Sequence, residues 1–525
     1  MIFNFDVMEK KELEADIVII GAGAAGITLA LEFIDQNIKV ALFESGDLKI
    51  RKRNQKLNLV QNTGIPYYDL SAQRGRYFGG TTNFWGGTCI PLEHTDFEEN
   101  AARPGFKWPI SFSEISPYIN KAKVICGVDA INSNKLIQKL HLKKNNLKSA
   151  MFEWRALQFS PFPFRFGERY RSKLNEAKNI DVYLNANLVS FESNRSKTVC
   201  KKATFRSVNG KEVKVSAKYF ILSTGGVENP RLLLNMKALF ANRNIGKYFA
   251  EHPTAIIGKL VGRDASKIYA EHQKKYIFDK EIKPGFSATE QFMKNHNLLN
   301  SFLTIWPIPK DMYVISRAKM LLYLLRRREF GIKLLLNLLF VIPKSATLLP
   351  HVFNRMGGRK NEINQLDDCF DVRLVTETIP NFFSDISLSE ERDALGMFRA
   401  SLNWQLEDID RRTFIFTAKA FKEQIEKTYD VKLELESWIH NDEENWYTNI
   451  NLDGHHGHHM GTTRMASNSK NGVVDKNCKV FGIQNVYVSG SSIFPTYGFS
   501  NPTLTIVAFA LRLSDHLKNK LKIGL

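Results

Sequence analysis

The first apolar run of the chain is short and β-branched, and a glycine-rich turn follows it directly. Residues 17–20 read IVII, and three glycines in the pattern GxGxxG come next: Gly21, Gly23 and Gly26. A helix is expected over residues 24–36, and a second apolar run over residues 39–43 ends at Glu44. Short apolar runs of this kind are typical of parallel strands buried on both faces. The order predicts a strand–turn–helix–strand unit of a Rossmann-like α/β fold.

Each part of this unit has a use in binding a dinucleotide. Gly21 permits the tight turn, Gly23 lets the backbone approach the pyrophosphate, and Gly26 lets helix and strand pack closely. The start of the helix offers free N–H groups and a positive dipole end to the phosphates. Glu44, eighteen residues after Gly26, is expected to accept hydrogen bonds from the adenosine ribose hydroxyls. The motif alone does not separate FAD from NAD.

A second glycine-rich stretch at residues 74–92 reads RGRYFGGTTNFWGGTCIPL. Glycines allow a loop to pass close over a flat ring system, and small polar side chains can hydrogen-bond a flavin edge or a phosphate. A tight loop without a ligand is the alternative. The candidate cofactor contacts in this loop are Gly79, Gly80, Thr81 and Asn83.

The C-terminal part of the chain carries the most specific pattern. Residues 458–465 read HHMGTTRM and residues 501–505 read NPTLT. Earlier segments read STGGVENPRLLL at residues 223–234 and IGKYFAEHP at residues 245–253. Together with the GGTTNFWGG loop, and in this order, these segments resemble the glucose–methanol–choline (GMC) oxidoreductases of bacterial type. The resemblance spans most of the chain and is weakest in its middle.

The resemblance implies a discontinuous Rossmann-like FAD-binding domain and an α+β substrate-binding domain with a mostly antiparallel sheet. The FAD-binding domain is expected at residues 1–110, 180–260 and 455–525, and the substrate domain at residues 111–179 and 261–454. Further cofactor contacts are implied in the later segments, at Gly225, Ser492, Pro502 and Thr503.

The resemblance also bears on how the cofactor is attached. In several relatives the GG loop carries a histidine that is bonded covalently to the flavin. The matching position here is Phe84, and phenylalanine cannot form that bond. Noncovalent FAD is therefore expected.

His458 takes the place of the family's catalytic histidine, and Asn501 the place of its partner. Hydride leaves an alcohol carbon for flavin N5 only as the hydroxyl loses its proton, and a neutral imidazole can take that proton near physiological pH. Asn501 does not ionise, so it is expected to orient the alcohol oxygen. Pro502 then begins a last long helix, whose positive end is expected to stabilise the reduced flavin.

The neighbouring histidines His455, His456 and His459 are ambiguous. A histidine run can bind a metal, but no acidic or cysteine partner falls at a familiar spacing, so no metal is expected. One of these histidines is a candidate for the substrate pocket and the others for loop hydrogen bonds. Trp404 is a candidate either for a pocket wall or for the core.

Composition adds a statement about partners and location. The 525 residues include 73 basic and 54 acidic side chains, and the net charge of +19 favours anionic partners. Five scattered cysteines without a CxxC pair indicate reduced thiols. No secretory signal is recognisable at the N-terminus, and no apolar run reaches the roughly 18 residues of a spanning helix. A cytoplasmic protein is expected.

Much of the positive charge lies in residues 311–360, which carry ten basic and two acidic side chains among interleaved leucines and aromatics. This pattern predicts amphipathic helices. They either lie on an anionic membrane surface, peripheral to the inner membrane face, or pack inside the substrate domain. On the membrane the substrate or acceptor would be membrane-bound, such as a lipid-linked sugar or a quinone. No recognisable nucleic-acid module accompanies the charge.

The function predicted from these observations is an FAD-dependent dehydrogenase that oxidises a CH–OH group of a sugar, a polyol or another alcohol. Two alternatives stay open. One is an alcohol or sugar oxidase that uses oxygen, and the other is a GMC-type lyase or decarboxylase that uses FAD without net alcohol oxidation. The sequence does not name the substrate.

Overall fold

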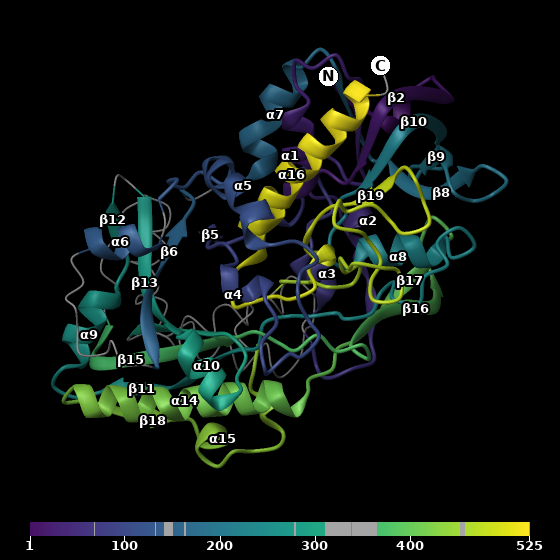
Figure 1. Cartoon of the computed structure of the whole chain (residues 1–525). Helices are drawn as coiled ribbons and strands as arrows, with labels where there is room; N and C mark the ends of the chain where they lie inside the picture. Colours follow the sequence, from purple (N-terminus) through teal and green to yellow (C-terminus); the bar gives the residue numbers. More distant parts are fainter. Residues whose placement is uncertain are drawn as a thin grey trace.

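The computed structural model describes most of the chain, in two halves that are visible in Figure 1. The basic segment expected at residues 311–360 lies outside the described residues apart from Leu338, and so do His455 and His456. The described residues are 1–67, 69–131, 133–140, 151–161, 164–277, 280–309, 338, 365–451 and 457–523.

A mostly parallel sheet forms the upper half in Figure 1. Within the described residues it has eight strands in the order β1-β7-β3-β2-β10-β9-β8, and β19 pairs with β10. β2 pairs in parallel with β3 and β10, whereas β9 runs antiparallel to β10 and β8. The strands are β1 (Ile2–Asn4), β2 (Glu12–Ile20), β3 (Val40–Glu44), β7 (Ile180–Leu184), β8 (Asn187–Ser193), β9 (Cys200–Arg206), β10 (Glu212–Leu222) and β19 (Val486–Val488).

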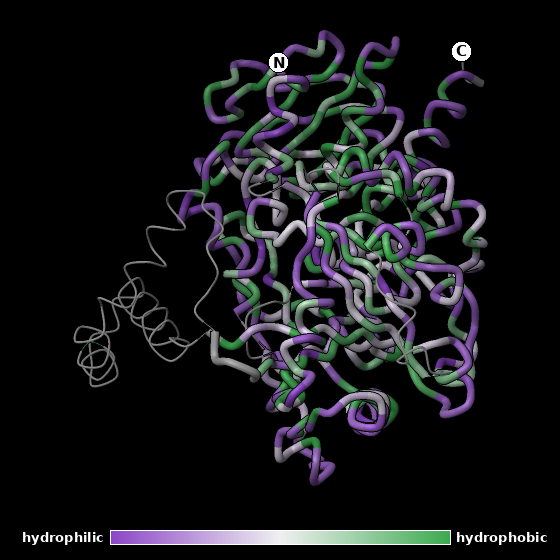
Figure 2. Tube along the Cα trace, turned by 90° about the vertical axis from the view of Figure 1, so that its left-hand side faces the viewer, coloured by the Kyte–Doolittle hydropathy of each residue, from purple (hydrophilic) through white to green (hydrophobic). Residues whose placement is uncertain are grey.

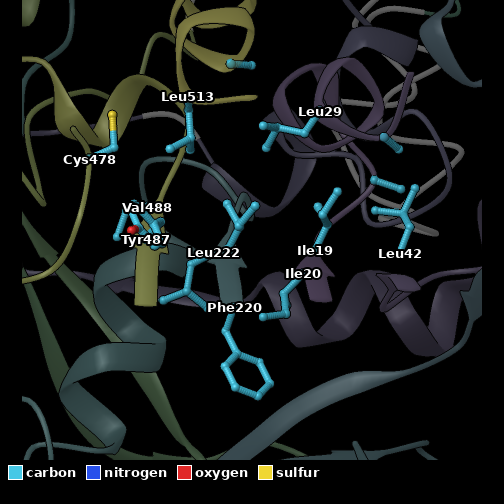
Figure 3. Close-up of a cluster of buried hydrophobic side chains, with 14 of the residues drawn as sticks. Ile19, Ile20, Leu29, Leu42, Phe220, Leu222, Cys478, Tyr487, Val488 and Leu513 are labelled. Carbon is cyan, nitrogen blue, oxygen red and sulfur yellow. The ribbon is translucent and has the colours of Figure 1, made fainter. Parts of the chain in front are cut away.

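The centre of this sheet is buried because its strands are apolar on both faces. Ile19 of β2, Leu222 of β10 and Val488 of β19 are fully buried and lie in one cluster (Figure 3). The long C-terminal helix α16 (Pro502–Ile523), yellow in Figure 1, starts at Pro502 as the sequence predicts. It packs against α1 (Ala24–Glu32) and α5 (Phe112–Ile125).

An antiparallel sheet forms the lower half. Within the described residues it has eight strands in the order β18-β11-β15-β14-β13-β6-β5, with β12 paired to β13, and α14 (Asp408–Thr428) packs on it. A small sheet β16-β17-β4 lies beside it. The strands are β4 (Val60–Asn62), β5 (Thr88–Cys89), β6 (Phe152–Phe159), β11 (Thr254–Val261), β12 (Lys275–Ile277), β13 (Lys280–Ala288), β14 (Ser301–Pro309), β15 (Gln365–Thr376), β16 (Asp385–Arg392), β17 (Phe398–Asn403) and β18 (Lys432–Leu435).

Shorter helices pack within both halves, such as α7 on the parallel sheet and α9 on the antiparallel sheet. The C-terminal block between α14 and α16 is mostly irregular, with the 3-10 turn η6 (Ser491–Ile493) before the last helix. The helices are α2 (Lys52–Gln55), α3 (Leu70–Gln73), α4 (His94–Phe97), α6 (Ser133–Lys139), α7 (Phe166–Glu176), α8 (Glu228–Asn235), α9 (Ala265–His272), α10 (Glu290–His296) and α15 (Ser437–His440).

The two halves confirm the predicted fold class, a Rossmann-like α/β part with a mostly antiparallel α+β part. Three elements pack in a different half from the one that the predicted domain boundaries give them. Residues 111–179 were expected in the substrate domain and residues 180–260 in the FAD-binding domain. Ile115 of α5 and Phe166 of α7 belong to the core of the parallel sheet, whereas Ile257 of β11 belongs to the core of the antiparallel sheet. A helix joins the core that its apolar face contacts, wherever it falls in the sequence.

Hydrophobic and hydrophilic stretches alternate along the trace in both halves (Figure 2). Among the helices of the described residues, none has the length and apolar character needed to cross a bilayer. All five cysteines lie in the described part of the chain and are free thiols, and four of them are buried.

Candidate active site

A cavity of about 880 Å³ is lined by residues of both halves. The glycine turn after β2, the GG loop and the C-terminal block form one part of its wall, and strands β6, β14 and β15 form another. The cavity brings together most of the site residues expected from the sequence: Gly21, Gly23, Glu44, Gly80, Thr81, Gly225, His458, Asn501, Pro502 and Thr503. Phe84 lines it as well.

Four other expected contacts lie behind this wall. At Gly26 an added Cβ would stand 1.9 Å from the carbonyl oxygen of Gly21, and at Gly79 it would stand 2.8 Å from the nitrogen of Gly167. The Asn83 amide donates to the Phe78 carbonyl at 3.0 Å. Gly26, Gly79 and Asn83 therefore hold the glycine loops against their neighbours.

Ser492 is the fourth residue behind the wall. It is fully buried, and its hydroxyl lies 2.9 Å from the Asn229 amide nitrogen and 2.7 Å from the Thr463 hydroxyl. Ser491, one residue earlier, lines the cavity instead. In the tight 3-10 turn Ser491 faces the cavity and Ser492 faces the protein interior. No sequence pattern indicates which of the two adjacent serines does so.

The end of the cavity next to β2 has the shape of a dinucleotide cradle. Gly21 has a φ of +100°, and a Cβ there would lie 2.7 Å from the carbonyl oxygen of Ser223. At Gly23 and Gly225, by contrast, an added Cβ would meet nothing within 4 Å, so both glycines leave open space. Helix α1 begins at Ala24, and its first N–H groups have no partner within the helix.

Glu44 closes the same end and is 5% exposed. Its two carboxylate oxygens accept hydrogen bonds from the backbone nitrogens of Ala22 at 2.9 Å and Gly46 at 2.8 Å. Burial raises the pKa of the Glu44 carboxyl, and these two donors oppose the rise. Each oxygen has a second lone pair for a further donor, so the carboxylate fits a ribose diol.

A buried ion-pair cluster beside Glu44 was not anticipated from the sequence. Glu228 lies on the cavity wall and pairs with Arg76 at 2.9 Å and Arg231 at 2.6 Å. Burial raises the pKa of Glu228, but Arg231, Arg76 and Arg74 outweigh burial and lower it to about 2. Arg231 also pairs with Asp393. Glu228 and Arg231 are three residues apart on α8, but Arg76 and Asp393 come from distant parts of the chain, so only the folded structure reveals the whole cluster.

The C-terminal block places His458 and Asn501 at the other end of the cavity. Nε2 of His458 lies 3.1 Å from Nδ2 of Asn501, and its Nδ1 lies 3.0 Å from Nδ1 of His252. The His458 side chain keeps 23% of its surface exposed. The imidazole is thus held at both nitrogens and still faces the cavity.

Glu251 holds the loop that carries His458. Its Oε2 accepts hydrogen bonds from the backbone nitrogens of Gly457 at 2.9 Å and His458 at 2.8 Å, and from the Tyr67 hydroxyl at 2.6 Å. Its Oε1 accepts the backbone N–H of His252 at 2.9 Å. Glu251 and His252 had no role assigned from the sequence, although both lie in the segment IGKYFAEHP. The adjacent acid and histidine in a segment of the family pattern were the signal that could have indicated them.

The contacts of the His458 ring assign its proton. Asn501 Nδ2 is a donor, so His458 Nε2, 3.1 Å away, accepts and carries the lone pair on the side of Asn501 and the cavity. The proton of the neutral ring then lies on Nδ1, which faces His252 Nδ1 at 3.0 Å and Glu251 Oε1 at 3.7 Å. Burial and the nearby His458 lower the pKa of His252 to about 3, so the His252 ring is neutral and its Nδ1 can accept.

Of the neighbouring histidines, His459 lines the cavity, as expected for one of them. It is buried beside Tyr67 and Phe249, and burial lowers its pKa to about 4. Trp404 is a core residue, 1% exposed, with its ring edge-on to Tyr67 at 5.2 Å. Glu251, His252 and His458 offer three potential metal-ligand atoms within 4.8 Å of one another. The Nδ1 atoms of the two histidines, however, already share a hydrogen bond.

Comparison with known proteins gives the family. Residues 380–510 match the family model described as GMC oxidoreductase, and residues 15–255 match that described as pyridine nucleotide-disulphide oxidoreductase. The match places residues 380–510 in the GMC oxidoreductase family. A curated relative, 2-methyl-1,2-propanediol dehydrogenase from Mycolicibacterium austroafricanum, is 22% identical over 97% of this chain and 96% of its own length.

Solved GMC structures share the fold. A formate oxidase from Aspergillus oryzae superposes with a TM-score of 0.56 at 16% identity, covering 97% of this chain and 99% of that chain. Pyridoxine 4-oxidase from Mesorbium loti superposes with a TM-score of 0.55 at 13% identity, covering 96% and 99%. The protein is an FAD-dependent oxidoreductase that acts on CH–OH donors. The open glycine cradle, the helix N-terminus and the Glu44 carboxylate fit this cofactor.

Proposed function

We propose that this GMC oxidoreductase is a dehydrogenase that oxidises an alcohol CH–OH group with His458 as the catalytic base. The supporting observation is the pair of hydrogen bonds at the His458 ring, which leaves the Nε2 lone pair directed to Asn501 and the cavity. Burial lowers the pKa of His458, and the Glu251 charge opposes this. The imidazole is therefore neutral near pH 7 and ready to take a proton.

Asn501 and the buried residues behind His458 have distinct tasks. The Asn501 amide is placed to hold the alcohol oxygen next to His458 Nε2, which shortens the path of the proton. Glu251 and His252 position the base and fix its tautomer, as argued from their contacts. FAD, when bound, supplies the acceptor for the two electrons that leave the carbon.

The remaining predictions from the sequence belong to this proposal. The cavity-lining glycines, Glu44, Thr81, Pro502 and Thr503 hold FAD, and Phe84 makes the attachment noncovalent. The electron acceptor is a quinone or another carrier, and the basic segment at residues 311–360 brings the protein to an anionic membrane face. The charge of that segment is the support for this last step.

Anaerobic reduction of the bound flavin tests the proposal. Sugars, polyols and simple alcohols are added to the holoenzyme while the absorption band near ~450 nm is recorded. An alcohol that bleaches the band in the wild type, but not in His458→Ala, supports the assignment of the base. The control is His440→Ala, at the exposed end of α15, which is expected to behave like the wild type.

Three outcomes would contradict the proposal. Equal bleaching by the wild type and His458→Ala would remove His458 from the proton transfer. Rapid return of the colour on admitting air, with peroxide formed, would make the protein an oxidase rather than a dehydrogenase. A product formed without any flavin reduction would favour the lyase alternative.

A further inference from the structure

One wall of the cavity is a face of the antiparallel sheet. Phe302, Thr304 and Trp306 occupy alternate positions of β14 and all line the cavity, as expected for residues on one face of a strand. Phe302 stacks on Phe499, with ring centroids 4.9 Å apart, and Phe499 comes two residues before Asn501. Phe302 therefore marks the catalytic end of this face, and Trp306 lies roughly 13 Å further along the strand.

Two cations line this wall. Arg373 of β15 lies opposite Thr304 in the sheet, and its guanidinium carbon is 5.6 Å from the centroid of the Trp306 ring. Lys274 lies over the Phe159 ring at 4.7 Å. The side chains of Arg373 and Lys274 both line the cavity.

A third cation is buried beside them. Lys283 of β13 is 1% exposed, and its Nζ lies 4.1 Å from the centroid of the Trp306 ring. Its ammonium group donates to the carbonyls of His272 and Ile305. Burial, Lys274 and Arg373 lower its pKa to about 7. Burial is the main cause, and the contributions of Lys274 and Arg373 show that both side chains lie near Lys283.

Carboxylates lie near these cations but do not line the cavity. Glu281 pairs with Lys274, and Asp371 lies near Lys259, Arg373 and Glu436. The described carboxylates that line the cavity, Glu44 and Glu228, lie at its nucleotide end. Among the described residues, the cavity surface at the sheet end therefore presents two cations, Arg373 and Lys274, and no carboxylate.

Oxidation of a neutral alcohol has no use for such a cluster. An arginine guanidinium offers planar paired donors that match a carboxylate or a phosphate. The Lys274 ammonium on the same wall adds a second donor. We propose that the substrate is an alcohol carrying an anionic group, which Arg373 and Lys274 bind while the CH–OH carbon lies at His458. This inference rests on the proposed function of the same cavity.

The geometry also limits the size of the substrate. Thr304 and Arg373 lie about 7 Å along the strand from Phe302, since side chains on one face repeat every two residues. The Arg373 side chain extends from this position. The anionic group and the hydroxyl that reacts are therefore separated by a short chain, as in small hydroxy acids, sugar acids and sugar phosphates.

Matched pairs of compounds test the substrate class. The holoenzyme is reduced anaerobically with glycerate against glycerol and with gluconate against glucitol, and glycerol 3-phosphate is added to distinguish phosphate from carboxylate. We expect the anionic member of a pair to reduce the flavin with at least about tenfold higher kcat/KM. Arg373→Gln should raise KM for that member by about 10- to 100-fold, because it loses a charge-assisted hydrogen bond.

Three variants separate a charge effect from a structural one. Arg373→Lys should keep part of the affinity for the anion, and Arg373→Gln should abolish the preference for the anionic over the neutral member. The control is Lys267→Gln, at an exposed lysine of α9 with 68% of its side chain accessible, and its KM should equal that of the wild type. Neutral members that react as well as anionic ones, or an unchanged KM in Arg373→Gln, would overturn the inference.

A binding measurement keeps the test independent of turnover. Malonate, which has no hydroxyl to oxidise, is titrated into the holoenzyme by calorimetry. Binding to the wild type and to His458→Ala, but not to Arg373→Gln, supports the anion site even if no alcohol of the panel reacts. Absence of malonate binding to the wild type overturns it. Failure of the base assignment is recognised separately, by flavin reduction that persists in His458→Ala.

Discussion

The backbone nitrogen of His458 donates a hydrogen bond to Oε2 of Glu251 at 2.8 Å, and the Glu251 side chain is 1% exposed. A buried carboxylate that accepts backbone N–H groups fixes the path of the chain and not only the orientation of one ring. The loop before His458 thus has a fixed anchor on a segment 207 residues earlier in the sequence. The precision of the base depends on this anchor.

We expect Glu251→Gln to lower kcat by up to about 100-fold with little change in KM, because a displacement of the base of about 1 Å is enough for such a loss. The amide keeps one acceptor oxygen and directs N–H groups at donors. The free energy of unfolding should fall by about 1–3 kcal/mol. Steady-state kinetics and thermal unfolding measure both effects. Glu290→Gln, at an exposed ion pair on α10, is the control.

The rate should depend on pH through His458. Burial lowers its pKa below the ordinary histidine value of about 6.5, and only the neutral ring can take the proton. kcat/KM should therefore be constant around pH 7 and fall on acidification only below about 6.5. In Glu251→Gln the charge that raises this pKa is lost, so the fall should move to lower pH. A fall that begins above pH 7 in the wild type would contradict the assignment.

With Phe84 in place of the covalently bonded histidine, we expect the FAD to be released when the protein is denatured. Since phenylalanine forms no bond to the isoalloxazine ring, acid precipitation should release all of the FAD into the supernatant. The absorption spectra of supernatant and pellet measure the partition. A pellet that stays yellow after washing with denaturant would show a covalent link at another residue.

Two glycines of the same motif should respond in opposite ways to alanine. In Gly26→Ala the new Cβ would clash with the Gly21 carbonyl, 1.9 Å away, so the apoprotein should lose stability by about 1–3 kcal/mol. In Gly23→Ala the Cβ meets no protein atom within 4 Å. This variant should fold normally as apoprotein and bind FAD more weakly. Thermal unfolding of the apoproteins and fluorescence titration with FAD compare them, and a stable Gly26→Ala would refute the packing argument.

Local patterns in the sequence predicted the parts of the site that are themselves local. The turn from Gly21 to Gly26, the strand that ends in Glu44 and the helix that begins at Pro502 all have signals within a few residues. Glu251 and His252 were missed because their partners come from the other end of the chain. Ser491 lines the cavity in place of the expected Ser492 because of one tight turn, which the sequence does not indicate. The cation cluster at Arg373 depends on strand register, which the sequence alone did not reveal.

The separation of the base from the sheet wall has an evolutionary consequence. His458 and Asn501 lie on the C-terminal block, whereas Phe302, Thr304 and Arg373 lie on strands of the other half. Residues at alternate strand positions can be exchanged without moving the backbone of the catalytic loop. Selection can therefore retune which molecule is accepted while the chemistry stays intact, and a library limited to these strand positions is a direct route to altered specificity.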